Sequence, residues 1–174
     1  DTEFTQGAKA DLVAGSQVSL IAKVTNNESF EVIKVRIELA NEISIEAVVE
    51  AVTETSFTLL GQEFSVDAYT QYEDDSATEL RNFTFTDIAV GDLLEVDAFD
   101  NAGNLVSRSI EREEINAKAE EAEVEGKVSN IDLPNLSIKG VIVATNDQTE
   151  FENAQGQEVT QAEFFAAIKL DNTV

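Results

Sequence analysis

The sequence contains no cysteine, histidine, methionine or tryptophan among its 174 residues. Without cysteine there are no disulfides, and without histidine or cysteine the Ser-His, Cys-His and zinc sites of common hydrolases cannot be assembled. Paired carboxylates could still catalyse, but acidic residues are so numerous that no pair stands out. We therefore predict that the protein is not an enzyme. The missing residues are also the most easily oxidised, which favours an extracellular, cell-surface or periplasmic location.

Long hydrophobic runs and basic residues are also scarce. The longest apolar run, Phe164–Ile168, is far below the roughly 20 residues that cross a bilayer, so membrane insertion is not expected. The chain has 35 acidic and 11 basic residues, a net charge of -24. This charge repels phosphate backbones and anionic lipid headgroups, so nucleic acid is excluded as a partner. No feature predicts a specific small-molecule ligand.

A Thr-x-aromatic signature occurs three times along the chain. Thr2-Glu3-Phe4 recurs as Thr70-Gln71-Tyr72 and as Thr149-Glu150-Phe151, at spacings of 68 and 79 residues. Since 43% of the residues are hydrophobic, the chain can build folded cores despite its charge. A spacing in this range indicates tandem structural repeats.

The alignment around these signatures extends over most of the chain. A constant offset of 79 residues places Ile45 on Val124, Phe57 on Leu136 and Gly61 on Gly140 without a gap. Residues 10–16 match residues 86–92 at an offset of 76 residues, again without a gap. We therefore predict three segments. The N-terminal segment (1–42) is the back half of a repeat, the middle segment (43–116) is a complete repeat, and the C-terminal segment (117–174) is a front half.

The middle segment has the pattern of five short strands. Apolar residues alternate with polar ones over 43–51, which is typical of a half-buried strand. Residues 57–60 and 63–66 flank Gly61-Gln62, and residues 93–99 and 105–110 flank Asp100–Asn104, so two hairpins are predicted. The expected fold is all-β, with tandem small OB-like β-barrels of about five strands each and partial repeats at both termini.

Residues 111–121 join the middle and C-terminal segments. Their sequence, EREEINAKAEE, has helix-forming composition, but Ile115 is its only large apolar residue. Both a linker helix and a solvated tether are compatible with this pattern.

The turn and core motifs resemble one known family. A Thr-x-aromatic signature is followed by Asp87–Asp92 (DIAVGD), by Leu93–Val96 (LLEV) and by Asp100–Val106 (DNAGNLV). This order resembles the bacterial domain-of-unknown-function family five-six-six-six, over one complete copy (Ile43 to Glu111) and two partial ones. The resemblance implies tandem OB-like repeats in an exported envelope protein, and it implies no activity. The C-terminal segment departs from the pattern, because Glu163–Ile168 stands where a Gly-Asp turn is expected.

Two acidic stretches are the candidates for binding a cation. The first stretch contains Glu73, Asp74 and Asp75, and the second contains Asp97 and Asp100. Carboxylate oxygens suit calcium and magnesium, but a solvated loop for the first stretch and a hairpin turn for the second are the favoured explanations. We expect no cofactor, and calcium or magnesium bound only loosely.

The two half repeats suggest how the protein functions. The strands that one terminal segment lacks are those that the other supplies, either within one molecule or between copies in a filament. The residues expected at this contact lie on strands that a half repeat would leave uncovered: Thr2, Phe4, Val18, Leu20, Val124, Val128, Thr149 and Phe151. We predict a structural or assembly protein of the cell surface whose partner is a second copy. The alternative is a ligand- or cation-binding repeat module of a larger envelope protein.

Overall fold

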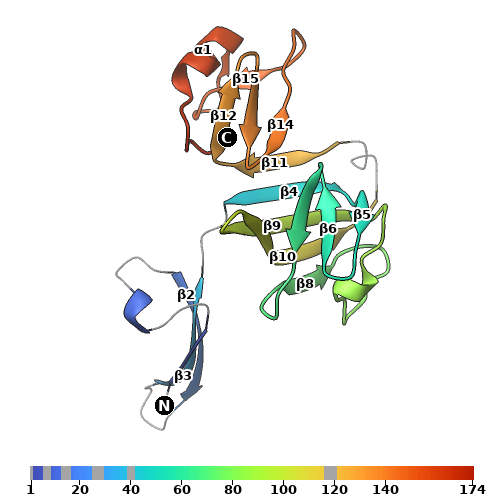
Figure 1. Cartoon of the computed structure of the whole chain (residues 1–174), viewed down its shortest axis with the longest axis vertical. Coiled ribbons are helices and arrows are strands. Elements are labelled where there is room, and N and C mark those ends of the chain that lie inside the picture. The colour runs from blue at the N-terminus through green and yellow to red at the C-terminus, as the bar shows by residue number, and fades with distance from the viewer. Residues whose placement is uncertain (1, 6–8, 13–16, 25–29, 39–41, 116–120) are drawn as a thin grey trace. The chain divides into compact units, whose positions relative to one another are not determined.

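The computed structural model describes residues 2–5, 9–12, 17–24, 30–38, 42–115 and 121–174. It divides the chain into two compact units, Asp1–Ala40 and Asn41–Val174. Regular structure in both units consists almost entirely of β-strands, which confirms the all-β prediction (Figure 1). In the described part of the chain no helix is long and apolar enough to span a membrane. The first predicted segment boundary lies within two residues of the unit boundary, whereas the middle and C-terminal segments share one unit.

Unit 1 contains a three-stranded sheet. Its elements are β1 (Glu3–Thr5), the 3-10 helix η1 (Lys9–Asp11), β2 (Gln17–Val24) and β3 (Phe30–Glu38). The strand order is β1-β3-β2, with β1 parallel and β2 antiparallel to β3. The Oγ1 of Thr2 donates a hydrogen bond of 2.9 Å to the carbonyl oxygen of Val32 and fixes the start of β1 on β3.

The middle segment of unit 2 supplies seven of the eight strands of the largest sheet. Its elements are β4 (Ile43–Val48), β5 (Ala51–Val52), β6 (Ser56–Leu59), β7 (Gln62–Ser65), β8 (Gln71–Asp74), the 3-10 helix η2 (Phe85–Asp87), β9 (Leu93–Asn101) and β10 (Asn104–Glu113). Both predicted hairpins are confirmed, as β6–β7 and β9–β10. Because β10 continues to Glu113, the first residues of the predicted linker belong to a strand, and residues 116–120 lie outside the described residues.

The strand order of this sheet runs β11-β4-β9-β10-β7-β6-β5, and β8 pairs with β10. No sheet of the described residues closes into a barrel, so the all-β class is confirmed and the OB-like barrel stays a prediction. Residues 43–52 change their pairing partner along their length. The N–H of Val49 bonds to the carbonyl of Asp92 before β9, at 2.8 Å, and the N–H of Glu50 bonds to Thr58 on β6, at 3.0 Å. The ladder is therefore interrupted between β4 and β5.

The C-terminal segment forms smaller sheets and the one α-helix of the described chain. Its elements are β11 (Glu123–Gly126), β12 (Val128–Asp132), β13 (Asn135–Ile138), β14 (Val141–Val143), β15 (Phe151–Glu152), β16 (Glu158–Val159) and α1 (Gln161–Ala167). β11 pairs antiparallel with β4, so the two segments are joined edge to edge (Figure 1). α1 begins at a capping box formed by Thr160 and Glu163.

The turn expected near Glu163–Ile168 is present, but it lies a few residues later. The Oδ1 of Asn172 accepts a hydrogen bond from the N–H of Lys169 at 2.8 Å, as the Oδ2 of Asp92 does from Ala89 at 2.9 Å. Asp171 has a φ of 67°, and Gly91 takes the corresponding position with a φ of 97°. The sequence pattern hid this turn because Asp-Asn replaces Gly-Asp and a helix precedes it.

Hydrogen bonds recur at the aligned residues. The Oγ1 of Thr70 donates to the carbonyl of Ser107 at 2.8 Å, as Thr2 does to Val32. A further bond recurs at the 79-residue offset. The Oγ1 of Thr70 accepts from the N–H of Asp67 at 3.0 Å, and that of Thr149 accepts from Asn146 at 2.9 Å. The same threonine side-chain bonds therefore recur at residues that the sequence alignment pairs.

One hydrophobic core extends across both segments of unit 2. Phe57 and Phe64 stack with ring centroids 5.6 Å apart, and both are fully buried. Leu136 and Ile138 of β13 belong to the same buried cluster. Gly126 allows β11 to approach, because a Cβ there would lie 2.7 Å from the Cγ2 of Ile138 and 2.8 Å from the carbonyl oxygen of Glu42. The middle and C-terminal segments therefore fold against each other.

Candidate assembly surface and acidic sheet face

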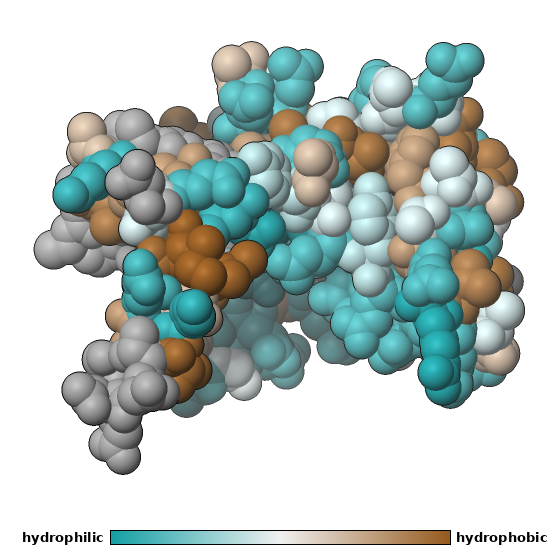
Figure 2. Space-filling view, turned by 90° about the horizontal axis from the view of Figure 1, so that it is seen from below, coloured by the Kyte–Doolittle hydropathy of each residue, from teal (hydrophilic) through white to brown (hydrophobic). Residues whose placement is uncertain are grey.

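The sheet of unit 1 exposes Leu20, whose counterpart in unit 2 is buried, whereas Val35 and Ile37 of the same sheet are themselves buried. Pairing in β2–β3 skips Ile33, and pairing in β9–β10 skips Arg108, so the two hairpins share a bulge at the same place. In this register Leu20 corresponds to Val96. Leu20 is 55% exposed, whereas Val96 is 0% exposed because unit 2 supplies strands that cover that face. Exposed hydrophobic residues are visible as brown atoms on the mostly teal surface in Figure 2.

The other assembly candidates of unit 1 lie on or beside this sheet. Thr2 fastens β1 through its hydrogen bond to Val32, and Phe4 pairs with Val35. Phe4 and Val18 are both half-buried. The four predicted residues Thr2, Phe4, Val18 and Leu20 are thus brought together on one small sheet, and Leu20 presents the largest exposed apolar surface among them.

The assembly candidates of the C-terminal segment are less exposed than expected. Val128 is buried, because it pairs with Ile138 while its N–H bonds to the carbonyl of Asn172 at 2.8 Å. Val124 packs partly against the core, and Phe151 is buried beside the ring of Phe164, with centroids 5.1 Å apart. The expectation of an open Val124–Val128 face is therefore corrected. Thr149 is engaged in its turn with Asn146.

Asp74 forms a buried ion pair with Arg112. Its carboxylate accepts hydrogen bonds from the Nε of Arg112 at 2.9 Å and from the Nη2 at 2.5 Å. It also accepts the backbone N–H groups of Ser76 and Leu80. The Arg112 guanidinium holds the pKa of Asp74 well below its usual value, and it lies 4.6 Å from the centre of the Phe83 ring. Asp74 therefore fastens β8 to β10, and its oxygens are occupied by protein donors.

A cluster of carboxylates lies on the β9–β10 hairpin. Glu95, Glu111 and Glu113 place one oxygen each within 4.8 Å of one another, which makes them the residues of the described chain that could share one cation. Burial, together with the charges of Glu113, Asp75, Glu73 and Glu95, raises the pKa of Glu111 to about 7. Burial and Asp97 raise the pKa of Glu95 as well. Sequence reasoning missed Glu95, Glu111 and Glu113, since strand pairing alone brings them together.

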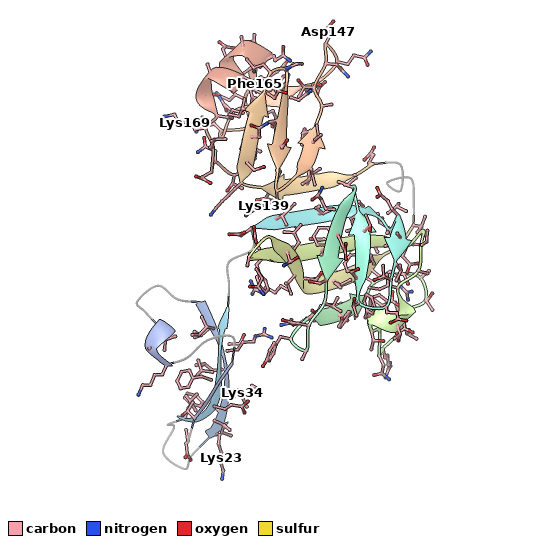
Figure 3. All side chains as sticks on the ribbon, in the orientation of Figure 1. Lys23, Lys34, Lys139, Asp147, Phe165 and Lys169 are labelled. Atoms are coloured by element: carbon pink, nitrogen blue, oxygen red, sulfur yellow. The ribbon has the colours of Figure 1, made fainter. Side chains whose placement is uncertain are left out.

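The remaining cation candidates lie in three different places. Glu73 and Asp75 lie beside Glu111, as their effect on its pKa indicates. Asp97 accepts a hydrogen bond from Ser109 at 3.2 Å. Asp100 closes the β9–β10 turn by accepting the N–H of Gly103, and it meets the Nζ of Lys139 at 3.3 Å. Lys139 (Figure 3) also lies 2.7 Å from Glu42, and its contact with Asp100 bridges the C-terminal and middle segments.

Replacing Glu111 with glutamine is expected to stabilise unit 2 at and above neutral pH. The raised pKa means that ionisation costs the folded state more than the unfolded state as pH rises from 4.5 to about 7. Glu111→Gln should therefore raise the free energy of unfolding by about 1–2 kcal/mol at pH 8 and change it little below pH 4, after allowance for solvent screening. Urea unfolding at several pH values checks this, with the exposed Glu114→Gln as control. An equal effect of both variants at pH 8 would contradict it.

Comparison with known proteins gives one match. The family model described as Domain of unknown function (DUF5666) matches residues 46–111 and 125–168. The two matched stretches fall in the middle and the C-terminal segments and together cover more than half of the chain. Neither the curated proteins nor the solved structures contain a match.

Proposed function

The chain belongs to the domain-of-unknown-function family DUF5666, and from this premise we propose that it is a non-enzymatic structural protein that assembles with further copies. In the assembly, the open sheet of one copy is completed by the complementary segment of another. A head-to-tail contact of this kind repeats into a filament. The observation that carries the proposal is the contrast between Leu20, which is 55% exposed, and the fully buried Val96 at the same position of the complete sheet.

The proposal includes OB-like folding of the middle segment. It is supported by the strand order, in which residues 43–52 pair with β9 at one end and with β6 at the other. It is further supported by the parallel pairing of β7 with β10, which places the third strand of the repeat beside the fifth. A repeat built in this way needs all five strands, because any missing strand leaves backbone edges and apolar side chains open.

A cell-surface or periplasmic location is part of the same proposal. It is supported by the absence of the easily oxidised residues cysteine, methionine and tryptophan. Binding of a ligand or cation by a module of a larger envelope protein stays the alternative hypothesis.

Replacing Leu20 with aspartate is expected to abolish association of the chain. The new carboxylate would have to enter the apolar face that the second copy covers, and burial of an unpaired charge is strongly unfavourable. Ile21→Asp is the matched control. Ile21 is 60% exposed on the same strand but corresponds to Asp97, on the opposite face of the sheet. Light scattering and electron microscopy measure the outcome. Association that survives Leu20→Asp as well as it survives Ile21→Asp would overturn the proposal.

Divalent cations are expected to promote association. Residues 41–174 carry 29 acidic and 7 basic side chains, so packing two copies brings like charges together. Magnesium or calcium in the millimolar range binds carboxylates, so it should lower this repulsion more than sodium chloride of equal ionic strength, which acts by screening alone. Light scattering with added calcium and then with a chelator tests the effect. If particle size neither rises with calcium nor falls with the chelator, the role of cations is refuted, but assembly itself is not.

A further inference from the structure

One edge of β15 is open among the described residues. β15 pairs with β16 through Phe151 and Val159, and the N–H of Asn153 bonds to Gln157 at 2.9 Å. Successive residues of a strand direct their backbone groups to opposite edges, so those of Glu152 point away from β16. Glu152 aligns with Glu73 of β8, and in the middle segment the corresponding edge of β8 is paired with β10. The N–H of Asp75 continues this pairing by donating to the carbonyl oxygen of Arg112 at 2.8 Å.

A groove of about 790 Å³ lies beside this open edge. It is lined by apolar side chains of α1 and of the chain end, among them Phe164, Ile168 and Val174. Three of its lining residues, Asn153, Asn172 and Val174, align with residues of the middle segment that meet Arg112. Asn153 aligns with Asp74, which binds Arg112. Asn172 aligns with Asp92, whose carboxylate lies 3.8 Å from the Nη1 of Arg112. Val174 aligns with Leu94, which pairs with Arg112 in the β9–β10 hairpin. The groove therefore occupies the place that the end of β10 fills in the middle segment.

We infer that β3 of a second copy docks in this groove, parallel to β15, with Phe151 beside Val35, Glu152 beside Arg36 and Asn153 beside Ile37. β3 is the counterpart of β10, since β1 and β3 pair in parallel as β8 and β10 do, and the same bulge interrupts both hairpins. In this register Val35 takes the position of the buried Ile110. The inference rests on the proposed assembly and names its acceptor and its donor strand.

Charge distribution supports the same pair of surfaces. Residues 1–40 carry six acidic and four basic side chains, so they are much closer to neutral than the rest of the chain. Lys23 and Lys34 project from β2 and β3 (Figure 3). Arg36 takes the position of Glu111, which in the middle segment is crowded by other carboxylates. In the docked register Arg36 lies opposite Glu152 and near Glu163 of the groove, so its contact with these carboxylates is attractive. Glu111, at the same position of the middle segment, is repelled by its carboxylate neighbours.

β1 competes with β15 for the same edge of β3. Glu3, Phe4 and Thr5 pair there with residues 34–36, and Glu3 lies 3.5 Å from the Nζ of Lys34. Docking of β15 therefore exchanges one short parallel strand for another. Deletion of residues 1–5 removes the competing strand from this edge. It is expected to increase association about ten-fold, which corresponds to about 1.4 kcal/mol.

Disulfide cross-linking tests the register directly, because the chain has no cysteine of its own. A chain with Glu152→Cys is mixed with a chain with Arg36→Cys in a glutathione buffer, and the control mixture replaces Arg36→Cys with Lys34→Cys. The control cysteine lies two residues away along the same face. Since a disulfide requires Cα atoms about 4.4–6.8 Å apart, the first mixture should yield about ten-fold more mixed dimer.

The outcomes separate the inference from the proposed function. Equal yields from the two mixtures, while light scattering shows that both chains associate, would overturn the docking of β3 on β15 and leave assembly intact. Absence of association for the parent chain and for the chain lacking residues 1–5 would overturn both. Circular dichroism of each cysteine variant shows that the β-sheets are retained before cross-linking is compared.

Discussion

Replacing Arg112 with methionine is expected to lower the free energy of unfolding of residues 41–174 by about 3 kcal/mol. The guanidinium neutralises the carboxylate of Asp74, whose side chain is fully buried, and the donors that would remain, from Ser76 and Leu80, carry no charge. A buried carboxylate without its cation is far more costly than the loss of a surface ion pair. Methionine keeps the length and apolar character of the side chain, so the effect reports on the charge.

Urea unfolding monitored by circular dichroism measures this loss. Arg81→Met is the matched control, because Arg81 is exposed, and it should change stability by less than about 0.5 kcal/mol. A double variant, Asp74→Asn with Arg112→Met, should recover part of the loss, since it leaves no buried charge. Equal stabilities of the Arg112→Met and Arg81→Met chains would show that the ion pair does not fasten β8 to β10.

Acid should lower the free energy of unfolding of the parent chain, because it protonates Asp74 of the same ion pair. The pKa of Asp74 is lowered by Arg112, so the ion pair stabilises the fold fully above the usual value of 3.8 and progressively less as pH falls below it. The Arg112→Met chain should lack this part of the acid dependence. Glu111 acts in the opposite direction and at higher pH, so the two contributions are separable.

Replacing Ile138 with alanine is expected to destabilise the whole of unit 2 by about 2–5 kcal/mol. Ile138 is 2% exposed and packs in the buried cluster that also holds Phe57 and Phe64 of the middle segment. Truncation leaves a cavity at this shared core, next to the close approach of Gly126. The middle and C-terminal segments should therefore lose stability together, in one transition.

Ile142 provides the control for this prediction. It lies on β14, the strand next to β13, and is 72% exposed, so Ile142→Ala should change stability by less than about 0.5 kcal/mol. Hydrogen exchange measured residue by residue resolves whether one unit or two unfold. If Ile138→Ala accelerates exchange only in residues 121–174, the two segments have separate cores and the common unit is refuted.

Local features of the fold were predictable from the sequence because they depend on neighbours in the chain. Alternation of apolar residues predicts β4, and Gly61 with a φ of 71° marks the β6–β7 turn. The 79-residue offset correctly aligns the β6–β7 hairpin with β13–β14, and the Thr70 turn with the Thr149 turn. Short-range hydrogen bonds and strand periodicity suffice for these predictions.

Features that depend on distant partners were not predictable. Glu95 and Glu111 are separated by 15 intervening residues and meet only because β9 and β10 pair. Arg112 stands in the acidic run Glu111–Glu113, and its isolated positive charge was the one sequence signal for the ion pair with Asp74. The pairing of β11 with β4 likewise gave no local signal, apart from a glycine at position 126 that leaves room for the contact.

Exposure of the terminal segments could be predicted only in part. Leu20 is open, as the half-repeat pattern indicates, but Val128 is covered by β13 and by backbone bonds from residues 171–172. The last residues of the C-terminal segment thus form backbone hydrogen bonds with β12, which the half-repeat pattern did not predict. The open edge of β15 and the groove beside α1 are the surfaces on which the inferred docking of β3 depends.

The mass of the native particle in solution tests the central claim most directly. Sedimentation velocity of the unmodified chain over a concentration series, in millimolar magnesium, measures it without any substitution. Association between copies predicts species heavier than the 18.9 kDa chain that grow with concentration. A single species of 18.9 kDa at every concentration would contradict the account.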